Sequence, residues 1–259
     1  HKTVGMVKPS LIFLLTLAAA TLLAQKANAS EDISIDEIMR RHVETMGGLY
    51  NWNQVQSIRL AGTIERDGKT ADIVIIKKRP NQIRATITLP IPGREDEEFQ
   101  IIRTHDGKTA WTATRLAGAA EIKKEELPED AANELLADAG VLPLLIKIWR
   151  EGAKLELLSP QRINGVTHFR IRATDKALHC DYTFYVSSDS FLVTQYDSID
   201  PQHRITQTTL DHYSVAQNVL IPKLSIIQAA QSGKSVMTTN SIEVGVGIYE
   251  EYFASKIAK

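Results

Sequence analysis

The chain has 259 residues, of which 43% are hydrophobic and 24% are charged, as in an ordinary soluble globular protein. Its 30 basic and 31 acidic residues nearly cancel, so there is no basic excess of the kind that binds nucleic acid. With Cys180 as its single cysteine, the chain has no internal disulfide.

The N-terminal segment, residues 1–29, has the pattern of a secretory signal peptide. Lys2 and Lys8 precede an apolar run from Leu11 to Leu23, and Ala27-Asn28-Ala29 fits a small-x-small cleavage site. The run is short for a membrane span, and an uncleaved anchor is the alternative. We therefore expect a signal peptide over residues 1–29, export, and one folded domain over residues 30–259.

An amphipathic helix is predicted over Glu31–Met46. Ser34 and Glu37 have the spacing of a capping box, and apolar residues recur at helical spacing after them. Gly47-Gly48 ends the helix, since glycine readily adopts the left-handed conformation of a C-terminal cap. We expect the apolar stripe to dock on a sheet; a helix that binds a partner is the alternative.

Three strands joined by two tight turns are predicted between Val55 and Leu89. The first strand, residues 57–64, and the third, residues 83–89, alternate apolar with polar side chains. The second strand, residues 71–76, is apolar on both faces over its last four residues. Such a strand must be covered on both faces, so we expect a second layer besides the main core.

The rest of the chain predicts more strands interrupted once by helices. The charged run Arg94–Glu98 is predicted as a loop, and a hairpin follows around Asp106-Gly107. Helical spacing then appears over Pro128–Ala139 and Val141–Trp149, and seven strands follow between residues 155 and 244. The short connections favour antiparallel pairing, and a sheet of about ten strands must curl, close or split. The predicted fold class is α+β: a strongly curled sheet that encloses an apolar cavity beneath a helical plug.

Two motifs resemble the periplasmic lipoprotein carrier family, LolA and its LolB-like relatives. The first is the strand end Ile75–Ile83, which contains Lys77-Lys78-Arg79-Pro80-Asn81, and the second is the hairpin Asp106–Trp111, Asp-Gly-Lys-Thr-Ala-Trp. The helical segment 128–149 falls where that family carries its lid. The resemblance covers about residues 34–150 and implies a periplasmic protein with an incomplete antiparallel β-barrel and an α-helical lid. In that family the hollow holds the acyl chains of lipoproteins in transit between membranes.

The resemblance also implies a binding site. Arg79 is expected to latch the lid, although without the resemblance it would be interpreted as a solvated turn arginine. The ligand, an acylated lipoprotein or another lipid, is expected to contact apolar side chains of the strands, hairpin and lid, namely Ile73, Ile75, Ile83, Ile87, Trp111, Leu135, Leu136, Leu144 and Leu145. Membrane-anchored donor or acceptor proteins are the expected partners. We expect a monomer with no cofactor and no metal.

Catalytic and metal-binding patterns are weak in this sequence. His179-Cys180-Asp181 resembles a metal corner, but alternate side chains of a strand face opposite ways, and no paired cysteines support zinc. No Gly-x-Ser-x-Gly motif of a serine hydrolase occurs. We predict a non-catalytic carrier, with a lipid-sensing regulatory interaction protein and an enzyme on the same scaffold as alternatives. An open apolar cavity beneath residues 131–149 would favour the carrier, and a solidly packed interior would favour a binding surface.

Overall fold

The computed structural model describes residues 33–117, 119 and 124–254. The predicted signal peptide, residues 1–29, lies outside the described residues. Within the described ranges, no helix is long and apolar enough to cross a bilayer.

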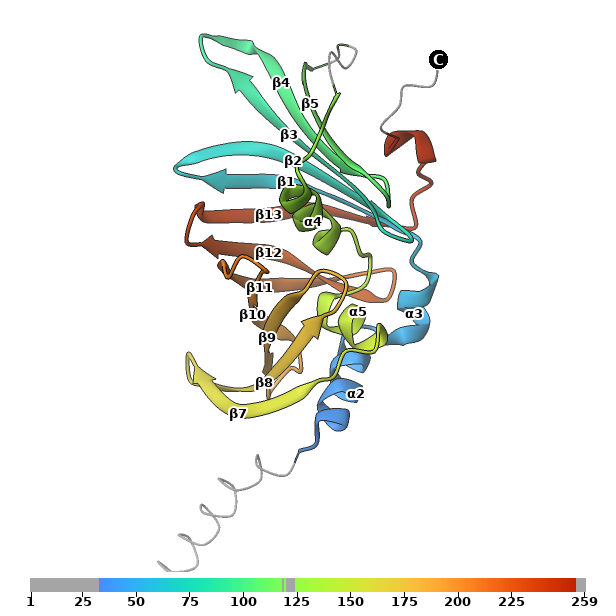
Figure 1. Cartoon of the computed structure of the whole chain (residues 1–259), viewed down its shortest axis with the longest axis vertical. Helices are drawn as coiled ribbons and strands as arrows, with labels where there is room; N and C mark the ends of the chain where they lie inside the picture. Colours follow the sequence, from blue (N-terminus) through green and yellow to red (C-terminus); the bar gives the residue numbers. More distant parts are fainter. Residues whose placement is uncertain (1–32, 118, 120–123, 255–259) are drawn as a thin grey trace, which may run out of the picture.

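One antiparallel sheet, 13 strands wide over the described residues, dominates the molecule (Figure 1). Strands β1 to β6 follow one another in one direction, β13 back to β7 follow in the other, and β1 pairs with β13 in the middle. The edges are therefore β6 and β7, and the sheet is strongly curled without closing into a barrel. The strands are β1 (Ser57–Arg66), β2 (Lys69–Lys78), β3 (Gln82–Ile91), β4 (Arg94–His105), β5 (Ala110–Leu116), β6 (Lys124–Glu126), β7 (Glu156–Ile163), β8 (Val166–Asp175), β9 (Cys180–Ser187), β10 (Val193–Ile199), β11 (Ile205–Ala216), β12 (Val219–Ala229) and β13 (Gly233–Val244).

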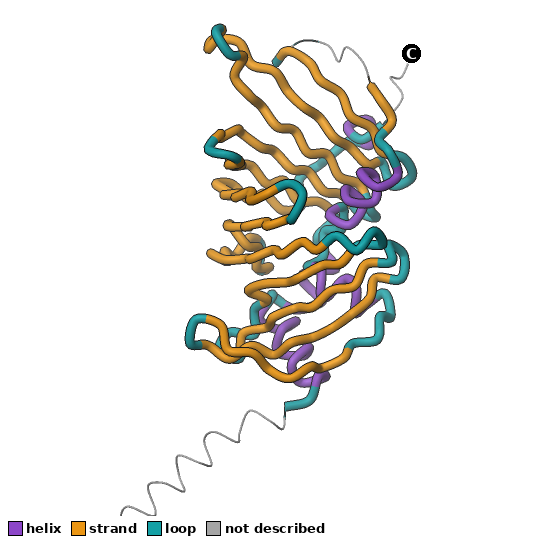
Figure 2. The backbone as a smooth tube through the Cα atoms, turned by 60° about the vertical axis from the view of Figure 1, so that its left-hand side comes forward, coloured by secondary structure: helices purple, strands orange, loops and turns teal. Residues whose placement is uncertain are grey.

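Along the chain, helices precede the first half of the sheet, connect its two halves and follow the second half. They are α2 (Ile35–Thr45) and α3 (Gly48–Gln54) ahead of β1, α4 (Glu129–Asp138) and α5 (Leu144–Arg150) between β6 and β7, and the 3-10 turn η1 (Glu250–Tyr252) after β13. Because β6 and β7 are opposite edges, the chain between them has to cross the sheet. It crosses on the concave side, where α4 and α5 lie (Figures 1 and 2). The predicted α+β class, with a curled sheet and an N-terminal helix, is confirmed.

Helix α2 docks on the sheet, as its apolar stripe predicts. The Ser34 side chain accepts a hydrogen bond from the Glu37 backbone N–H at 3.2 Å, which caps the first turn. Ile38 and Met39 are buried against β8, β9, β10 and α5. The helix ends at Thr45 with Met46 as its C-cap, and Gly47 follows with a φ of +104° that suits glycine; a Cβ there would lie 2.1 Å from the Asn218 carbonyl oxygen.

The structure differs from the predicted elements at several places. The charged run Arg94–Glu98 is the start of β4 and pairs with β3. Ladder bonds join backbone groups, so charged side chains are compatible with a strand when they face water. The helix α3 and the strand β6 were not expected, because seven and three residues are too few to show a clear period.

A C-terminal strap, residues 248–254, covers the convex face of β2 to β5. The Trp111 indole N–H donates to the Phe253 carbonyl oxygen at 3.1 Å, and Arg84 donates to the Tyr252 carbonyl oxygen at 2.9 Å. Phe253 is fully buried, and Ile76, which pairs with Arg84 on this face, retains 9% of its accessible surface. The strap is thus one of the two covers that the doubly apolar strand β2 requires.

Candidate functional site

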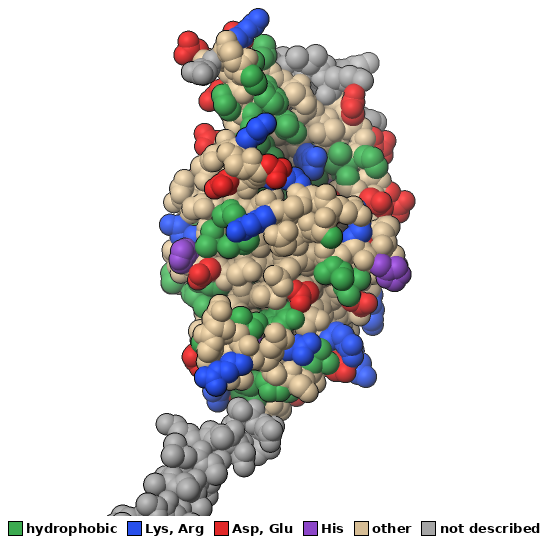
Figure 3. All heavy atoms as spheres, turned by 90° about the vertical axis from the view of Figure 1, so that its left-hand side faces the viewer, with side chains coloured by type: hydrophobic (Ala, Val, Ile, Leu, Met, Phe, Trp, Pro, Cys, Tyr) green, Lys and Arg blue, Asp and Glu red, His purple; other side chains and the backbone are tan. Residues whose placement is uncertain are grey.

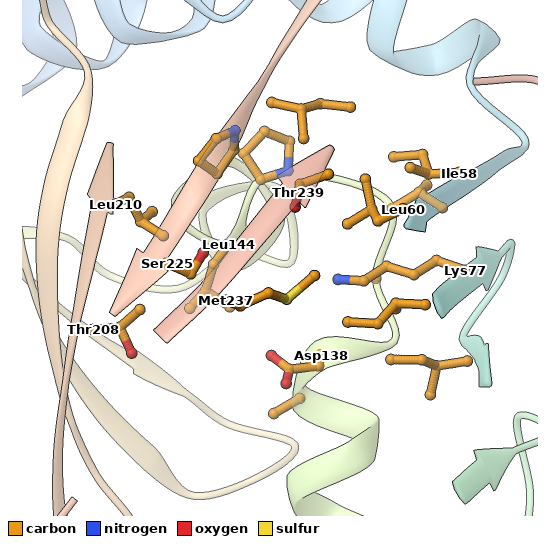
Figure 4. A pocket seen from close by; sticks show the side chains of 18 of the residues that line it. Ile58, Leu60, Lys77, Asp138, Leu144, Thr208, Leu210, Ser225, Met237 and Thr239 are labelled. Carbon is orange, nitrogen blue, oxygen red and sulfur yellow. The ribbon is translucent and has the colours of Figure 1, made fainter. Parts of the chain in front are cut away.

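The concave side of the sheet is hollow. A cavity of about 470 Å³ lies between the strands and α2, α4 and α5 (Figure 4). Its lining is mainly apolar. The strand residues at its wall are Ile58, Leu60, Ile64, Ile73, Ile75, Lys77, Ile83, Ala85, Ile87, Arg103, Phe184, Val193, Tyr196, Thr208, Leu210, Tyr213, Leu220, Ile221, Pro222, Ser225, Ile227, Ser235, Met237 and Thr239.

The period-2 pattern of β2 and β3 builds one wall of the cavity. Ile73 pairs with Ile87, Ile75 with Ala85, and Lys77 with Ile83. Residues that pair across an antiparallel ladder share a face, so these six side chains all face inward. The intervening residues of β2 face the convex side, where Ile76 pairs with Arg84, a residue that donates a hydrogen bond to the strap.

The opposite wall comes from β10 to β13. Figure 4 shows Thr208, Leu210, Ser225 and Met237 projecting into the same space as Leu60 of β1. Sequence reasoning did not place this wall in the site. The alternating apolar positions of these strands were visible, but the pairing of β1 with β13 brings them to the cavity, and no local pattern predicts that pairing.

Helix α4 covers the cavity loosely. None of its side chains is buried, and Leu135 faces the cavity. Leu136 instead lines a smaller pocket between α4 and the turn that joins β4 to β5. From the other side of the cavity, Arg204 forms an ion pair with Glu134 at 3.4 Å, and Gln202 donates to Asp130 at 3.3 Å. The helix therefore bridges both halves of the sheet.

Helix α5 is packed much more firmly than α4. Leu145, Ile146 and Ile148 are buried, which makes α5 part of the core. Lys147 forms an ion pair with the buried Asp175 carboxylate at 3.2 Å, and Arg150 donates to the Asn53 side chain of α3 at 2.6 Å. In this arrangement α5 is a fixed plug and α4 is the cover.

Seven of the nine apolar residues predicted for the site line the cavity: Ile73, Ile75, Ile83, Ile87, Leu135, Leu144 and Leu145. Their role in binding a ligand stays a prediction. Leu136 and Trp111 do not belong to this lining. Trp111 lies on the convex face with Ile102 and Ala113, because it pairs with Thr104 on the face opposite to Arg103. Its indole packs beneath the strap and not around a ligand.

Arg79 does not contact the lid in the way that the resemblance implies. Its Nε donates to the Val55 carbonyl oxygen at 2.8 Å, and its Nη2 donates to the Trp52 carbonyl oxygen at 3.1 Å. Both acceptors lie at the end of α3 and in the residue after it. Burial and the nearby Arg150 lower the pKa of Arg79. Arg79 thus fixes α3, which in turn accepts the hydrogen bond from α5.

A few polar groups face the cavity from its apolar wall. Figure 4 shows the Lys77 side chain extending inward from β2, while Asp138 at the end of α4 points into the same space. Burial lowers the pKa of Lys77, and the Asp138 charge opposes that shift. Burial raises the pKa of Tyr196 to about 12, so its hydroxyl is neutral at pH 7. Sequence reasoning missed Lys77, although it lies two residues after Ile75 on the same face.

His42 contributes a buried imidazole to the cavity wall. Its Nδ1 lies 2.8 Å from the Phe191 carbonyl oxygen, which can only accept, so Nδ1 carries the proton. The other ring nitrogen, Nε2, is buried without a hydrogen-bond partner. Burial lowers the pKa of His42 from 6.5 to about 4, against the opposing effect of the Phe191 bond.

Little in the described part of the chain suggests a metal or a nucleic-acid site. Over those residues, no group of three or more His, Cys, Asp or Glu side chains could hold a metal ion. His179 lies in a turn before β9, so it shares no strand face with Asp181. Burial raises the pKa of the Cys180 thiol. On the face shown in Figure 3, basic and acidic side chains are interspersed.

Comparison with solved structures identifies the fold. A protein of the DUF1329 family from Desulfovibrio piger shares 12% identity, with a TM-score of 0.54 over 85% of this chain and 97% of that one. A LolA superfamily protein from Nitrosomonas europaea also shares 12% identity, with a TM-score of 0.54 over 83% and 97%. A domain assigned to outer membrane lipoprotein sorting, from Vibrio parahaemolyticus, shares 13% identity, with a TM-score of 0.52 over 84% and 94%. No protein-family model and no functionally curated protein matches the sequence. The fold matches that of the LolA-like superfamily.

Proposed function

We propose that this protein is an exported, non-catalytic carrier that holds the acyl chain of a lipoprotein or of another lipid. The observation that carries the proposal is the apolar cavity of about 470 Å³ beneath α4. Its size lies within the range of roughly 300–1,000 Å³ that is common for small-molecule sites. Each methylene moved from water into it contributes about 0.8 kcal/mol, so one acyl chain suffices for reversible binding.

Two further observations support carriage. The cover, α4, has no buried side chain, so it can move without opening a packed core. The fold is shared with a domain assigned to lipoprotein sorting. The signal-peptide pattern of residues 1–29 supports export, and with this fold it supports a periplasmic location, where membrane-anchored proteins would deliver and accept the ligand.

The polar groups of the cavity do not favour an enzyme. A hydroxyl nucleophile needs a base within hydrogen-bond reach, and a lysine of lowered pKa reacts with a carbonyl substrate such as an aldehyde or ketone, which an acyl chain does not supply. Lys77 and Asp138 face each other but form no ion pair, and the Tyr196 hydroxyl stays protonated because its pKa is raised. The wall is therefore suited to holding a chain and not to transforming it.

The direct test is mass spectrometry of lipids that co-purify with the natively exported protein. We expect acylated molecules in about equimolar amount, released by organic solvent. Protein that carries no lipid, and that binds no acyl probe after purification, would contradict carriage and leave the interaction protein as the better explanation.

A first prediction concerns the cavity face of the lid. Leu135→Glu and Leu144→Glu each place a carboxylate against the apolar wall, where an unpaired charge is strongly disfavoured. We expect each variant to bind a fluorescent fatty-acid probe about tenfold more weakly or worse, and probe binding to fall far more than stability does. Leu157→Glu, on the partly exposed edge strand β7, is the matched control and should bind the probe normally. Equal probe retention in all four proteins would show that the cavity is not the site.

A further inference from the structure

The most unusual member of the cavity wall is Lys77. It is the one residue of the inward-facing β2 set Ile73, Ile75 and Lys77 that carries a charge. Figure 4 shows its side chain extended across the cavity toward Met237. Within the described residues its ammonium has no hydrogen bond and no ion pair, and its pKa is lowered by burial. A charge held among apolar groups without a partner is costly unless something else compensates it.

Asp138 supplies only part of that compensation. Its carboxylate faces the same space and favours the charged form of Lys77, but the two groups are not in contact. Asp138 is also the last residue of α4, where the helix dipole disfavours a negative charge. Its position is therefore unfavourable for the helix, and the attraction to Lys77 opposes that effect.

The other charges near the cavity are engaged or face solvent. Lys147 pairs with Glu151 and Asp175, Glu134 pairs with Arg204, and Arg103 is exposed. Among the described residues that line the cavity, Lys77 is thus the half-buried cation that has a donor free for a ligand. Three N–H groups on one ammonium suit a single carboxylate well.

We propose that the cavity takes a single-chain amphiphile with a carboxylate head, with the chain along the apolar wall and the head paired with Lys77. This inference rests on the proposed function and narrows it to a free long-chain acid. The acyl groups of a lipoprotein are esters and amides, which cannot neutralise the ammonium. The carboxylate of the ligand and the carboxylate of Asp138 would both be attracted to the Lys77 ammonium, so they compete for the same cation.

The test compares dodecanoate, methyl dodecanoate and dodecyl phosphate as ligands of the mature protein at pH 7.4, by displacement of a neutral fluorescent probe. In the unaltered protein we expect dodecanoate to bind about tenfold more tightly than the methyl ester. Lys77→Met keeps the length and apolar packing of the side chain, and it should reduce this preference to about twofold or less while the ester binds as before. Asp138→Asn should change the preference in the opposite direction, with tighter binding of dodecanoate.

The outcomes separate the inference from the function on which it rests. If the acid and the ester bind equally, or if Lys77→Met keeps the preference, the carboxylate site is refuted and carriage stands. If dodecyl phosphate binds more tightly than dodecanoate, the anion is a phosphate and the assignment of a fatty acid is wrong. If none of the three compounds binds, both the inference and the carrier function fail.

Discussion

At the scale of single residues, the cavity wall contains a histidine that is unsuited to carrying a charge. His42 is buried on α2, with Nδ1 bonded to the Phe191 carbonyl oxygen and Nε2 without a partner. Protonation would place a cation among apolar side chains. The folded state therefore favours the neutral ring, and the pKa falls from 6.5 to about 4.

This burial makes stability depend on pH in a predictable direction. The unfolded chain binds a proton at His42 near pH 6.5, whereas the folded chain binds it only near pH 4. The stabilisation from neutral His42 is thus complete above pH 6.5 and is lost as the pH falls from 6.5 toward 4, by about 2 kcal/mol between pH 7 and pH 5. We expect His42→Gln to remove about that much of the pH dependence in urea unfolding at pH 7 and pH 5. Burial also lowers the pKa of His105. Because His105 is present in both proteins, its contribution to the pH dependence cancels in the comparison. An identical loss of stability in both proteins would contradict this account.

At the scale of elements, the two lid helices have different roles. The α5 helix contributes buried side chains to the core, whereas α4 contacts the sheet through half-buried ones. The polar contacts of α4 with the turn between β10 and β11 are solvent-exposed, and exposed ion pairs hold weakly. We infer that α4 moves when a ligand enters and that α5 stays in place.

The ion pair between Glu134 and Arg204 gives a way to test that motion. Glu134→Gln removes the partner on α4 and leaves the bonds of Arg204 to Asp200 intact. We expect exchange of a bound acyl probe to become roughly two- to fivefold faster, with an unchanged unfolding midpoint. Glu129→Gln removes a carboxylate of the same helix that forms no ion pair within the described residues, and it should leave the exchange rate unchanged. Equal rates in the three proteins would show that this contact does not hold the cover.

The family resemblance implies that Arg79 latches the lid, and a substitution of Arg79 tests that role. Its guanidinium holds the end of α3 through two backbone carbonyls. Arg79→Leu leaves those acceptors without their donor, so we expect a loss of stability of about 1–3 kcal/mol. Probe exchange should change little, because α4 is not among the groups that Arg79 contacts. Slower exchange with unchanged stability would instead support the latch implied by the family resemblance.

Much of the fold could be predicted because its signals are local. The alternation of Ile73, Ile75 and Lys77, the capping residues of α2 and the helical spacing around Leu135 and Leu144 each specify an element and the face that it buries. The site was predicted less completely. The period of β5 does not tell which face of the sheet becomes concave, so Trp111 was assigned to the cavity. The wall from β10 to β13 depends on the pairing of β1 with β13, in which the paired residues are 169 to 186 positions apart in the chain.

At the scale of the whole molecule, the two faces of the sheet differ in how they are covered. The concave face is left hollow beneath α4, and the convex face of β2 to β5 is sealed by the strap, residues 248–254. Lys124 and Arg84 also lie over the Trp111 ring, with the Lys124 Nζ 4.2 Å from its centroid. The contacts of the strap and the proposed binding site thus lie on opposite faces of one sheet.

This separation predicts a variant that loses stability without losing its ligand. Phe253→Ala removes a fully buried ring from the strap, which we expect to cost about 3–5 kcal/mol of unfolding free energy. Emission from Trp111 should shift to longer wavelength as water reaches the indole, measured with Trp52 and Trp149 replaced by phenylalanine. Affinity for an acyl probe should stay within about twofold of the unaltered protein under conditions where both are folded. A large loss of affinity would show that the two faces are coupled.

The course of the chain between β6 and β7 has a mechanical consequence. The segment that holds α4 and α5 is anchored at its two ends to β6 and β7, the opposite edge strands of the open sheet. A ligand wide enough to move these edge strands apart would stretch the segment, and a narrower ligand would not. On the proposed function, the width of the ligand would therefore be linked to how tightly this segment closes the cavity.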